Sequence, residues 1–445
     1  MPEAPNVIFI TTDHLRYDNL GANGNANMVT PVLDGLARAG VSLDRLYVQN
    51  PVCMASRASI WTGRYPQNHG GTANGVPLSK DEPNMTRAFY EAGYRTVNVG
   101  KLHFQNHEPA RTAAQNAEVY AGYGYETNLL SDEPGCYDDD YIEWVKRVAP
   151  QHVEAVRVPM PGDRCGHNDR WPLNAPEWVS HPAWITEQAI EFINDHPGDR
   201  PLFMTLGYYN PHPPMNPPQA FLDLYNPASL PMPVQAQDVQ GISGEAWREV
   251  KQYFYAMVSH VDACVGRVLD TLHEAGMERN TIVVFTSDHG DSLGDFGHLG
   301  KGPWNHEEVL RVPGIVRWPG GLPAKRRVGP LMESIDLFPT LATLCGVEVP
   351  YGVKGRDCAG LWRGETEAGR ASALTEFKMN RRGLSVKTLR TDRYKYTRRN
   401  DKSETLCDFE RPQAEAENLA DDPQYAPILG DMRQALLDRL IDAED

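Results

Sequence analysis

The sequence predicts an α/β fold, in which helices cover both faces of a large, mainly parallel sheet, followed by a small α+β subdomain. Short runs of apolar and β-branched residues, each ending in polar side chains, recur along much of the chain. Such runs are typical of parallel strands that are buried on both faces. Between them lie segments whose apolar residues recur at the spacing of an amphipathic helix. This alternation favours a mainly parallel sheet.

The individual elements follow this alternation in order. Near the N-terminus, NVIFITTDH is an apolar run that ends in Asp13-His14 and predicts a strand. The next segment, PVLDGLARAG, predicts a helix that stops at Gly40. We expect strands at residues 6–14, 41–48, 94–100, 201–209 and 280–290. We expect helices at residues 31–40, 84–93 and 249–276.

Residues 104–180 depart from this pattern. They are rich in Pro, Gly, Trp, His and Asp, and only residues 139–148 suggest a helix. In a parallel sheet, ligands bind beyond the carboxyl ends of the strands. We therefore expect 104–180 to form long loops over such a site.

The pattern changes again near residue 371. LSVKTLRTDRYKYTRR (384–399) predicts two strands joined by a turn, and 427–444 predicts a final helix. We therefore divide the chain into a catalytic domain, residues 1–370, and a C-terminal subdomain, residues 371–445.

Charge and composition exclude several functions. The formal net charge of -16 argues against nucleic-acid binding, which needs a basic surface. No segment approaches the ~20 apolar residues of a membrane span, so we expect no membrane partner. The N-terminus resembles no signal peptide, and the odd number of scattered cysteines, seven, indicates free thiols. We expect a cytoplasmic protein, or a periplasmic one if an export signal was removed.

Polar residues at two strand ends suggest a metal site. Asp13 follows the first strand, and Asp288-His289 follows TIVVFTS. A single aspartate after a strand is usually a turn residue. Two such ends that meet at one edge of a sheet can instead direct carboxylates at one cation.

Cationic and imidazole side chains stand at other strand and loop ends. They are Arg57, Lys101, His103, His212 and Lys301. Each alone is best explained as a surface charge or a packed loop residue. Together, beside a metal, they provide what a tetrahedral oxyanion substrate requires.

The motifs of this chain, taken in order, resemble those of a known family. CMASRASIWTG, beginning at Cys53, resembles the sulfatase signature. The order NVIFITTDH, CMASR, GKLHF, NPHPP, TSDHGD and GK resembles the type I sulfatases of the alkaline-phosphatase superfamily, and TDRYKYTRR, LCDFE and AENLADDP resemble their C-terminal subdomain. The resemblance covers nearly the whole chain. It implies an alkaline-phosphatase-like fold and a sulfuric ester hydrolase of the arylsulfatase kind.

The resemblance also implies a function for Cys53. In such enzymes a maturation enzyme oxidises this cysteine to formylglycine, an aldehyde that is active as its hydrate. One hydroxyl attacks sulfur and displaces the alcohol, and the second then expels sulfate and regenerates the aldehyde. Arg57 would orient the hydrate.

The remaining site residues take their roles from the same resemblance. The metal ligands would be Asp13, residue 53, Asp288 and His289. The groups that hold the sulfuryl oxygens or protonate the leaving oxygen would be Lys101, His212 and Lys301. His103 would deprotonate the second hydroxyl. Calcium is the metal expected, with manganese, which a histidine ligand favours, or magnesium as alternatives.

Two positions depart from the family pattern. Many relatives have paired aspartates where this chain has Asp13-His14, so one carboxylate is missing. The His14 side chain could reach the metal in place of the missing carboxylate, but as the neighbour of a strand-end residue it is expected to point away. Ala55 replaces the commoner proline of the signature, which leaves the route of maturation open.

Other functions remain open at this stage. A phosphonate monoester hydrolase or phosphodiesterase of the same superfamily is the main alternative, because a phosphate diester is also tetrahedral and carries the same single charge as a sulfate monoester. An unmodified Cys53 would leave a protein that only binds sulfated ligands. A phosphate-transferring mutase is disfavoured by CMASR.

The substrate is expected to be a small aryl or sugar sulfate, and the oligomeric state stays open. Loop tryptophans that could stack on its ring are Trp144, Trp171, Trp178 and Trp184.

Overall fold

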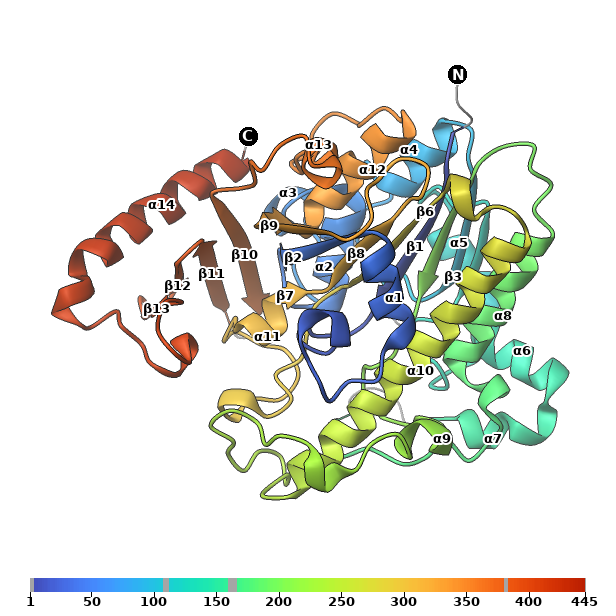
Figure 1. The fold of residues 1–445 in the computed structure, drawn as a ribbon, viewed down its shortest axis with the longest axis horizontal. Coiled ribbons are helices and arrows are strands. Elements are labelled where there is room, and N and C mark those ends of the chain that lie inside the picture. Colours follow the sequence, from blue (N-terminus) through green and yellow to red (C-terminus); the bar gives the residue numbers. More distant parts are fainter. Residues whose placement is uncertain (1–3, 107–111, 159–165, 380–382, 445) are drawn as a thin grey trace.

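The computed structural model describes residues 4–106, 112–158, 166–379 and 383–444. Its main body is a nine-stranded sheet in the order β4-β3-β5-β1-β6-β8-β2-β7, with β9 paired to β2. The strands are β1 (Asn6–Thr12), β2 (Val41–Tyr47), β3 (Arg95–Gly100), β4 (Thr127–Leu130), β5 (Leu202–Gly207), β6 (Thr281–Ser287), β7 (Arg311–Val312), β8 (Gly314–Arg317) and β9 (Arg326–Glu333). The predicted α/β class is confirmed (Figure 1).

The centre of the sheet is parallel and fully buried. β1 pairs in parallel with β5 on one side and β6 on the other, and β3 continues the parallel set beyond β5. Successive side chains of a strand point to opposite faces. Accordingly, Val7 and Phe9 of β1 belong to one core and Ile8 and Ile10 to the other. Only β7 and β8 run antiparallel to their neighbours.

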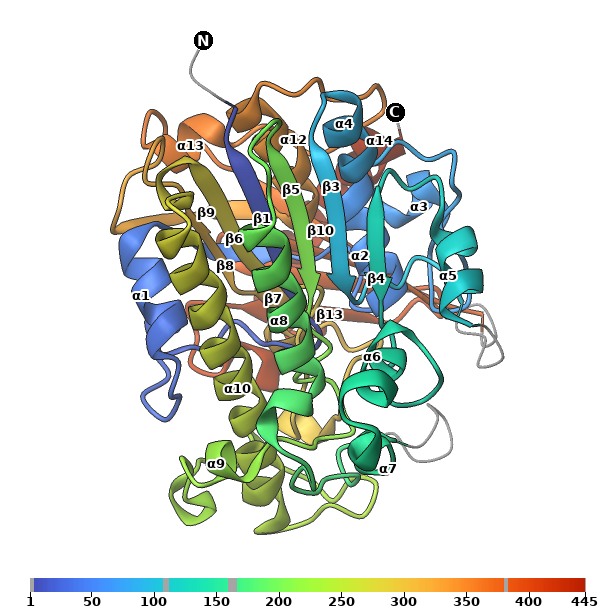
Figure 2. The same ribbon diagram turned by 90° about the vertical axis from the view of Figure 1, so that its right-hand side faces the viewer.

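Helices cover both faces of this sheet. They are α1 (Pro31–Ala39), α2 (Cys53–Thr62), α3 (Pro66–His69), α4 (Met85–Glu91), α5 (Ala113–Tyr120), α6 (Asp140–Val148), α7 (Val153–Val156), α8 (His181–Asn194), α9 (Gln219–Leu222), α10 (Ala246–Glu274), α11 (Glu307–Leu310), α12 (Leu337–Cys345) and α13 (Ala359–Arg363). The core with Ile8 contains α1, α6, α8 and α10, and the core with Val7 contains α2, α4 and α12. Figure 2 looks onto α8 and α10, which run side by side across one face.

The C-terminal part forms a second, antiparallel sheet. Its strands are β10 (Ser372–Met379), β11 (Leu384–Thr391), β12 (Tyr394–Arg399) and β13 (Glu404–Asp408). The final helix, α14 (Ala426–Glu444), packs on this sheet through Leu429, Met432 and Leu436 (Figure 1). The two strands expected within 384–399 and the final helix are present. The domain boundary at 370/371 stays a prediction.

The segment 104–180 has more regular structure than expected. The predicted helix is present as α6, but α5 and the edge strand β4 also lie in this segment. β4 is short, mostly half-buried and paired only with β3, so its sequence TNLL carries no long apolar run. Residues 107–111 and 159–165 of this segment lie outside the described residues. Among the described helices, none is long and apolar enough to cross a membrane.

Candidate active site

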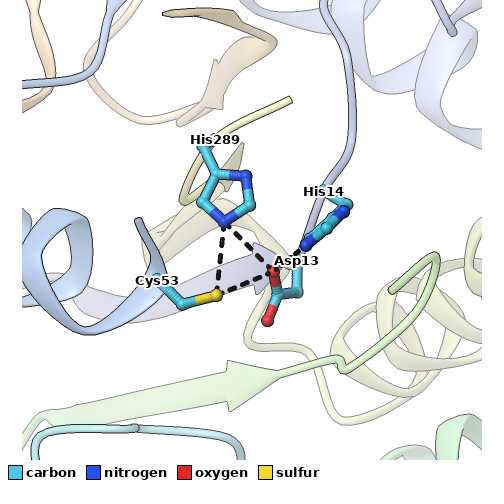
Figure 3. Close-up of side chains that lie close together, drawn as sticks. All are labelled: Asp13, His14, Cys53 and His289. Carbon is cyan, nitrogen blue, oxygen red and sulfur yellow. Dashed lines mark hydrogen bonds and ion pairs between the residues drawn. The ribbon is translucent and has the colours of Figure 1, made fainter. Parts of the chain in front are cut away.

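The site lies where β1 and β6 end. The two strands pair in register up to Thr12 and Ser287, so the next residues, Asp13 and Asp288, leave the sheet side by side. Helix α2 begins with Cys53 at the same edge, as the sequence predicted for strand-end residues in a parallel sheet. Asp13, Cys53 and His289 face one another in Figure 3.

Cys53 is enclosed by charged groups. It is 1% exposed, and its Sγ lies 3.3 Å from His289 Nε2, 3.6 Å from Asp13 Oδ1 and 2.5 Å from Lys301 Nζ. Burial, together with the nearby Asp13 carboxylate, raises the pKa of the Cys53 thiol to about 12. The thiol itself therefore resists ionisation.

Four buried side chains direct donor atoms at one point. Asp13, His14, Cys53 and His289 each offer a ligand atom, and these atoms all lie within 4.8 Å of one another. A carboxylate and two imidazoles suit a divalent cation, and the imidazoles favour a softer ion than calcium. The ammonium of Lys301 lies 2.8 Å from His14 Nε2 and 3.1 Å from His289 Nε2, so this point already accommodates a positive charge. The donor set therefore fits a divalent metal.

The expectation that His14 points away from the site was wrong. Its backbone has φ 69°, in the left-handed region that non-glycine residues rarely adopt. Its Nδ1 lies 2.6 Å from Asp291 Oδ2, and its Nε2 faces the donor group, 3.7 Å from Asp13 Oδ1. Strained backbone of this kind collects at functional sites. The sequence could not show this direction of the His14 side chain. The alternation of side chains along β1 predicts that His14 points to the side opposite Asp13.

Asp288 has other partners in this structure. Its Oδ2 accepts a hydrogen bond from Arg57 Nε at 2.8 Å, and its Oδ1 accepts one from the His289 backbone N–H at 2.9 Å. Oδ1 is also 3.7 Å from His289 Nε2, so the carboxylate borders the donor group. Its role as a ligand stays a prediction.

Arg57 is fully buried and joins three strand ends. Besides Asp288, it donates to the carbonyl oxygens of Lys101 at 3.0 Å and Thr12 at 3.3 Å. Lys101 follows β3, so one guanidinium fixes the ends of β1, β3 and β6 relative to one another. These contacts make Arg57 a positioning residue; its predicted contact with a hydrate stays a prediction.

Lys101 brings a second ammonium group to the site. Its Nζ lies 2.8 Å from Asp13 Oδ2 and 3.4 Å from Glu133 Oε1. Burial disfavours the charged form of Lys101, but the two carboxylates outweigh this and raise its pKa. Asp132 accepts hydrogen bonds from the backbone N–H groups of Leu102 and His103, both at 2.8 Å, and so holds the segment that carries Lys101 and His103.

The His212 side chain packs beside the potential metal ligands. Its ring contacts those of His14, at 4.3 Å between centroids, and Tyr209, at 4.5 Å. Burial lowers the pKa of His212 to about 4, with Asp13 opposing and Lys301 reinforcing the shift, so the imidazole is neutral near pH 7.

The sequence analysis missed Asp291 and His167. Asp291 Oδ2 lies 2.6 Å from His14 Nδ1 and 2.9 Å from His167 Nε2, while Oδ1 accepts from the backbone N–H groups of Leu293 and Gly300. Asp291 thus holds His14 and the loop that leads to Lys301. Asp291 could have been identified from the sequence, because it belongs to the stretch SDHGD. His167 belongs to no motif, so nothing in the sequence distinguishes it from the other residues of its loop.

The four tryptophans have different settings. Trp184 is 1% exposed within the core and contacts Tyr141, so it cannot stack on a ligand, which corrects the expectation for this residue. Trp144 and Trp178 contact each other edge to face at 6.1 Å. Trp178 stays 42% exposed, and Trp171 is half-buried.

Comparisons with known proteins identify the family to which this chain is similar. A family model described as sulfatase matches residues 5–347, and one described as N-sulphoglucosamine sulphohydrolase, C-terminal, matches residues 294–442. The chain is 28% identical to an arylsulfatase of Clostridium perfringens, over 99% of this chain and 95% of the relative. It is 26% identical to a Delta 4,5-hexuronate-2-O-sulfatase of Bacteroides thetaiotaomicron, over 100% and 90%.

A solved structure shows the same fold. The phosphonate monoester hydrolase of Agrobacterium radiobacter superposes with a TM-score of 0.86 at 24% identity, over 99% of this chain and 96% of that one.

Proposed function

The chain belongs to the sulfatase family of the alkaline-phosphatase superfamily and is a sulfuric ester hydrolase; from that premise we propose that it cleaves the sulfate monoester of a sugar, with residue 53 as formylglycine hydrate. The observation that carries this proposal is the position of Cys53. It begins α2 within reach of Asp13, His289 and Lys301. Because the side chain is buried, a maturation enzyme would have to act before the fold closes around it.

The donor group would hold one divalent metal. Asp13, His14, residue 53 and His289 are the ligands we propose, with Asp288 beside them. When bound, the metal would act as a Lewis acid that lowers the pKa of a hydroxyl on residue 53. Calcium is the ion that the family resemblance suggested, but two imidazoles favour manganese.

The first half-reaction transfers the sulfuryl group to residue 53. A bond forms between its hydroxyl oxygen and sulfur, and the bond from sulfur to the sugar oxygen breaks. That oxygen leaves with the electron pair and would take a proton from the ammonium group of Lys301 or Lys101, while the attacking hydroxyl would lose its own proton to solvent. Lys301 and Lys101 carry fixed positive charge beside residue 53, where it stabilises the negative charge that shifts during attack. His212, neutral near pH 7, is better suited to orient the group than to protonate it.

The second half-reaction releases sulfate. We propose that His103 removes the proton of the second hydroxyl, so that the carbonyl forms again as the bond from oxygen to sulfur breaks. The support for this role is the family resemblance and the position of His103. Asp132 fixes its backbone two residues beyond Lys101, in a left-handed conformation with φ 57°.

Phosphonate monoester or phosphodiester hydrolysis is the second candidate. The observation that favours it is the single carboxylate at Asp13-His14, together with the fold shared with the phosphonate monoester hydrolase. The cationic groups hold one tetrahedral anion of single charge, and they do not by themselves distinguish sulfur from phosphorus.

An assay panel on protein of known residue 53 tests the proposal. Sulfated monosaccharides, an aryl sulfate, an aryl phosphate diester and an aryl phosphonate monoester would be compared by kcat/KM. We expect the largest kcat/KM for a sulfate ester, and for a sulfated sugar over the aryl ester. A higher kcat/KM for the phosphonate or the diester would establish the second candidate instead.

A further inference from the structure

A second group of potential metal ligands lies outside the active site. Glu177, His260 and Cys264 each offer a donor atom, and these atoms all lie within 4.8 Å of one another. His260 and Cys264 are four residues apart on α10, so they share one face of that helix. Glu177 belongs to the short 3-10 turn Glu177–Val179, directly before α8. The group therefore joins the start of α8 to the middle of α10.

The distances within this group suit a small transition-metal ion. Glu177 Oε1 lies 3.0 Å from His260 Nε2, and Ser180 Oγ lies 3.4 Å from the same nitrogen. Bonds to zinc are about 2 Å from nitrogen or oxygen and about 2.3 Å from sulfur, which places ligand atoms roughly 3.3–3.7 Å apart in a tetrahedral site. Glu177 Oε1 and His260 Nε2 now stand at hydrogen-bond distance, so these two donors would move apart to this spacing when an ion binds between them.

The surroundings are those of a built site. His260 and Cys264 are each 1% exposed, and the Phe221 ring lies over the imidazole at 4.6 Å between centroids. The imidazole contacts both other members of the group: its Nε2 lies 3.0 Å from Glu177 Oε1, and its ring also hydrogen-bonds the Cys264 side chain. The Glu177 side chain is 41% exposed, so an ion can reach the group from solvent.

The local charge also favours a cation. Burial disfavours the charged imidazole, yet Cys264 and Glu177 outweigh burial and raise the pKa of His260 to about 9. A divalent ion would satisfy the same negative surroundings and, unlike a proton, would also bind the thiolate.

We propose that Glu177, His260 and Cys264 bind one zinc-class divalent ion, with water as a fourth ligand. On binding, the Cys264 thiol and the His260 imidazolium would each release a proton to solvent, so that a thiolate and a neutral imidazole coordinate the ion. The ion would tie the start of α8 to α10, two of the helices that cover one face of the central sheet. This site is independent of the chemistry at residue 53, so either assignment can fail without the other.

The test uses the full chain carrying Cys53→Ala, which removes the active-site thiol. Loaded with cobalt, this protein should show the charge-transfer absorption of a thiolate bound to cobalt. Zinc should displace the cobalt and abolish the band. Cys264→Ser should remove the band, whereas Cys407→Ser, at another buried cysteine, should keep it.

Glu177→Gln provides a second variant in case Cys264→Ser does not fold, because Glu177 is largely on the surface. Its affinity for zinc at this site, measured by displacement of cobalt from the charge-transfer band, should fall by about ten-fold or more. Absence of the cobalt band in the Cys53→Ala protein would overturn the proposal. So would a band that survives Cys264→Ser, or a zinc affinity that Glu177→Gln leaves unchanged.

Discussion

At the scale of single residues, the catalytic contribution of Lys301 is open to measurement. Its Nζ lies 2.5 Å from Cys53 Sγ, and the side chain is half-buried. A fixed charge aimed at the reacting group stabilises the transition state by ~3–4 kcal/mol, so Lys301→Ala should slow the chemical step about 10²–10³-fold. Single-turnover kinetics measure this step directly. Lys80→Ala, on the surface, is the control; equal rates for the two variants would remove Lys301 from the mechanism.

His103 should affect a different step. If it serves only the release of sulfate, His103→Ala will cleave the ester once and then stall with sulfate bound to residue 53. A rapid-mixing assay with an aryl sulfate should then show a burst of alcohol about equal to the enzyme, followed by a slow steady rate. A uniformly slow first turnover without a burst would place His103 in the first half-reaction.

Asp291 should act through His14. Its carboxylate holds the Nδ1 side of the ring, which leaves Nε2 facing the donor group. Partners of this kind typically change metal affinity 10–100-fold, so Asp291→Asn should weaken manganese binding by about that factor. Calorimetric titration with manganese gives the affinity without reference to turnover. Asp270→Asn, exposed on α10, is the control; an affinity that matches it would mean that Asp291 does not position His14.

The residues of the site were predictable to different extents. Asp13, Asp288 and His289 could be predicted because buried parallel strands are readable as apolar runs, and the residues directly after such strands stand at the ligand edge. The direction of His14 could not, since it depends on one left-handed backbone angle and on Asp291, far along the chain. His167 was also unpredictable, because its contact with Asp291 depends on how a long loop folds back.

At the level of helices and strands, the N-cap residue of α6 allows the effect of a buried carboxyl group on stability to be measured. Its N-cap, Asp139, accepts hydrogen bonds from Ile142 N–H and Ser131 Oγ. Burial nevertheless raises the pKa of Asp139 from 3.8 to about 7, so the folded protein favours the protonated form. The stability that this group contributes is full below pH 3.8 and is lost as pH rises through 7.

Asp139→Asn cannot ionise and should escape this loss. The midpoint of thermal unfolding should therefore fall less between pH 5 and pH 8 for Asp139→Asn than for the parent, by an amount equivalent to a few kcal/mol, on the order expected for a shift of this size. Parallel pH dependence in the two proteins would show that Asp139 ionises in the fold at its ordinary pKa.

The elements themselves were predicted unevenly, for a physical reason. β1, β3, β5 and β6 form the parallel centre, where both faces need apolar side chains, and all four were expected from sequence. β7 and β8 span two and four residues, too short for any periodicity. β4 lies at the edge of the sheet, where polar residues are tolerated. Its sequence therefore has no pattern of apolar residues from which a strand could be predicted.

At the level of the whole molecule, α14 is tied to the segment that follows α2, the helix that begins with Cys53. Arg439 of α14 contacts Tyr65, just beyond α2, and lies 3.0 Å from Glu333 Oε2. Asn68 Nδ2 donates to the Ala443 carbonyl at 2.9 Å. These contacts link the C-terminal helix to the segment just beyond the end of α2.

We expect turnover to require an oxidised residue 53 in this setting. The most direct measurement is the sulfatase activity of preparations that differ in the fraction of formylglycine, with that fraction determined by the mass of the peptide containing residue 53. We expect activity to rise in proportion to the fraction, and Cys53→Ala to fold normally and lose several orders of magnitude in rate. Full activity with unmodified cysteine, or a Cys53→Ala protein close to the parent rate, would show that turnover does not require an oxidised residue 53.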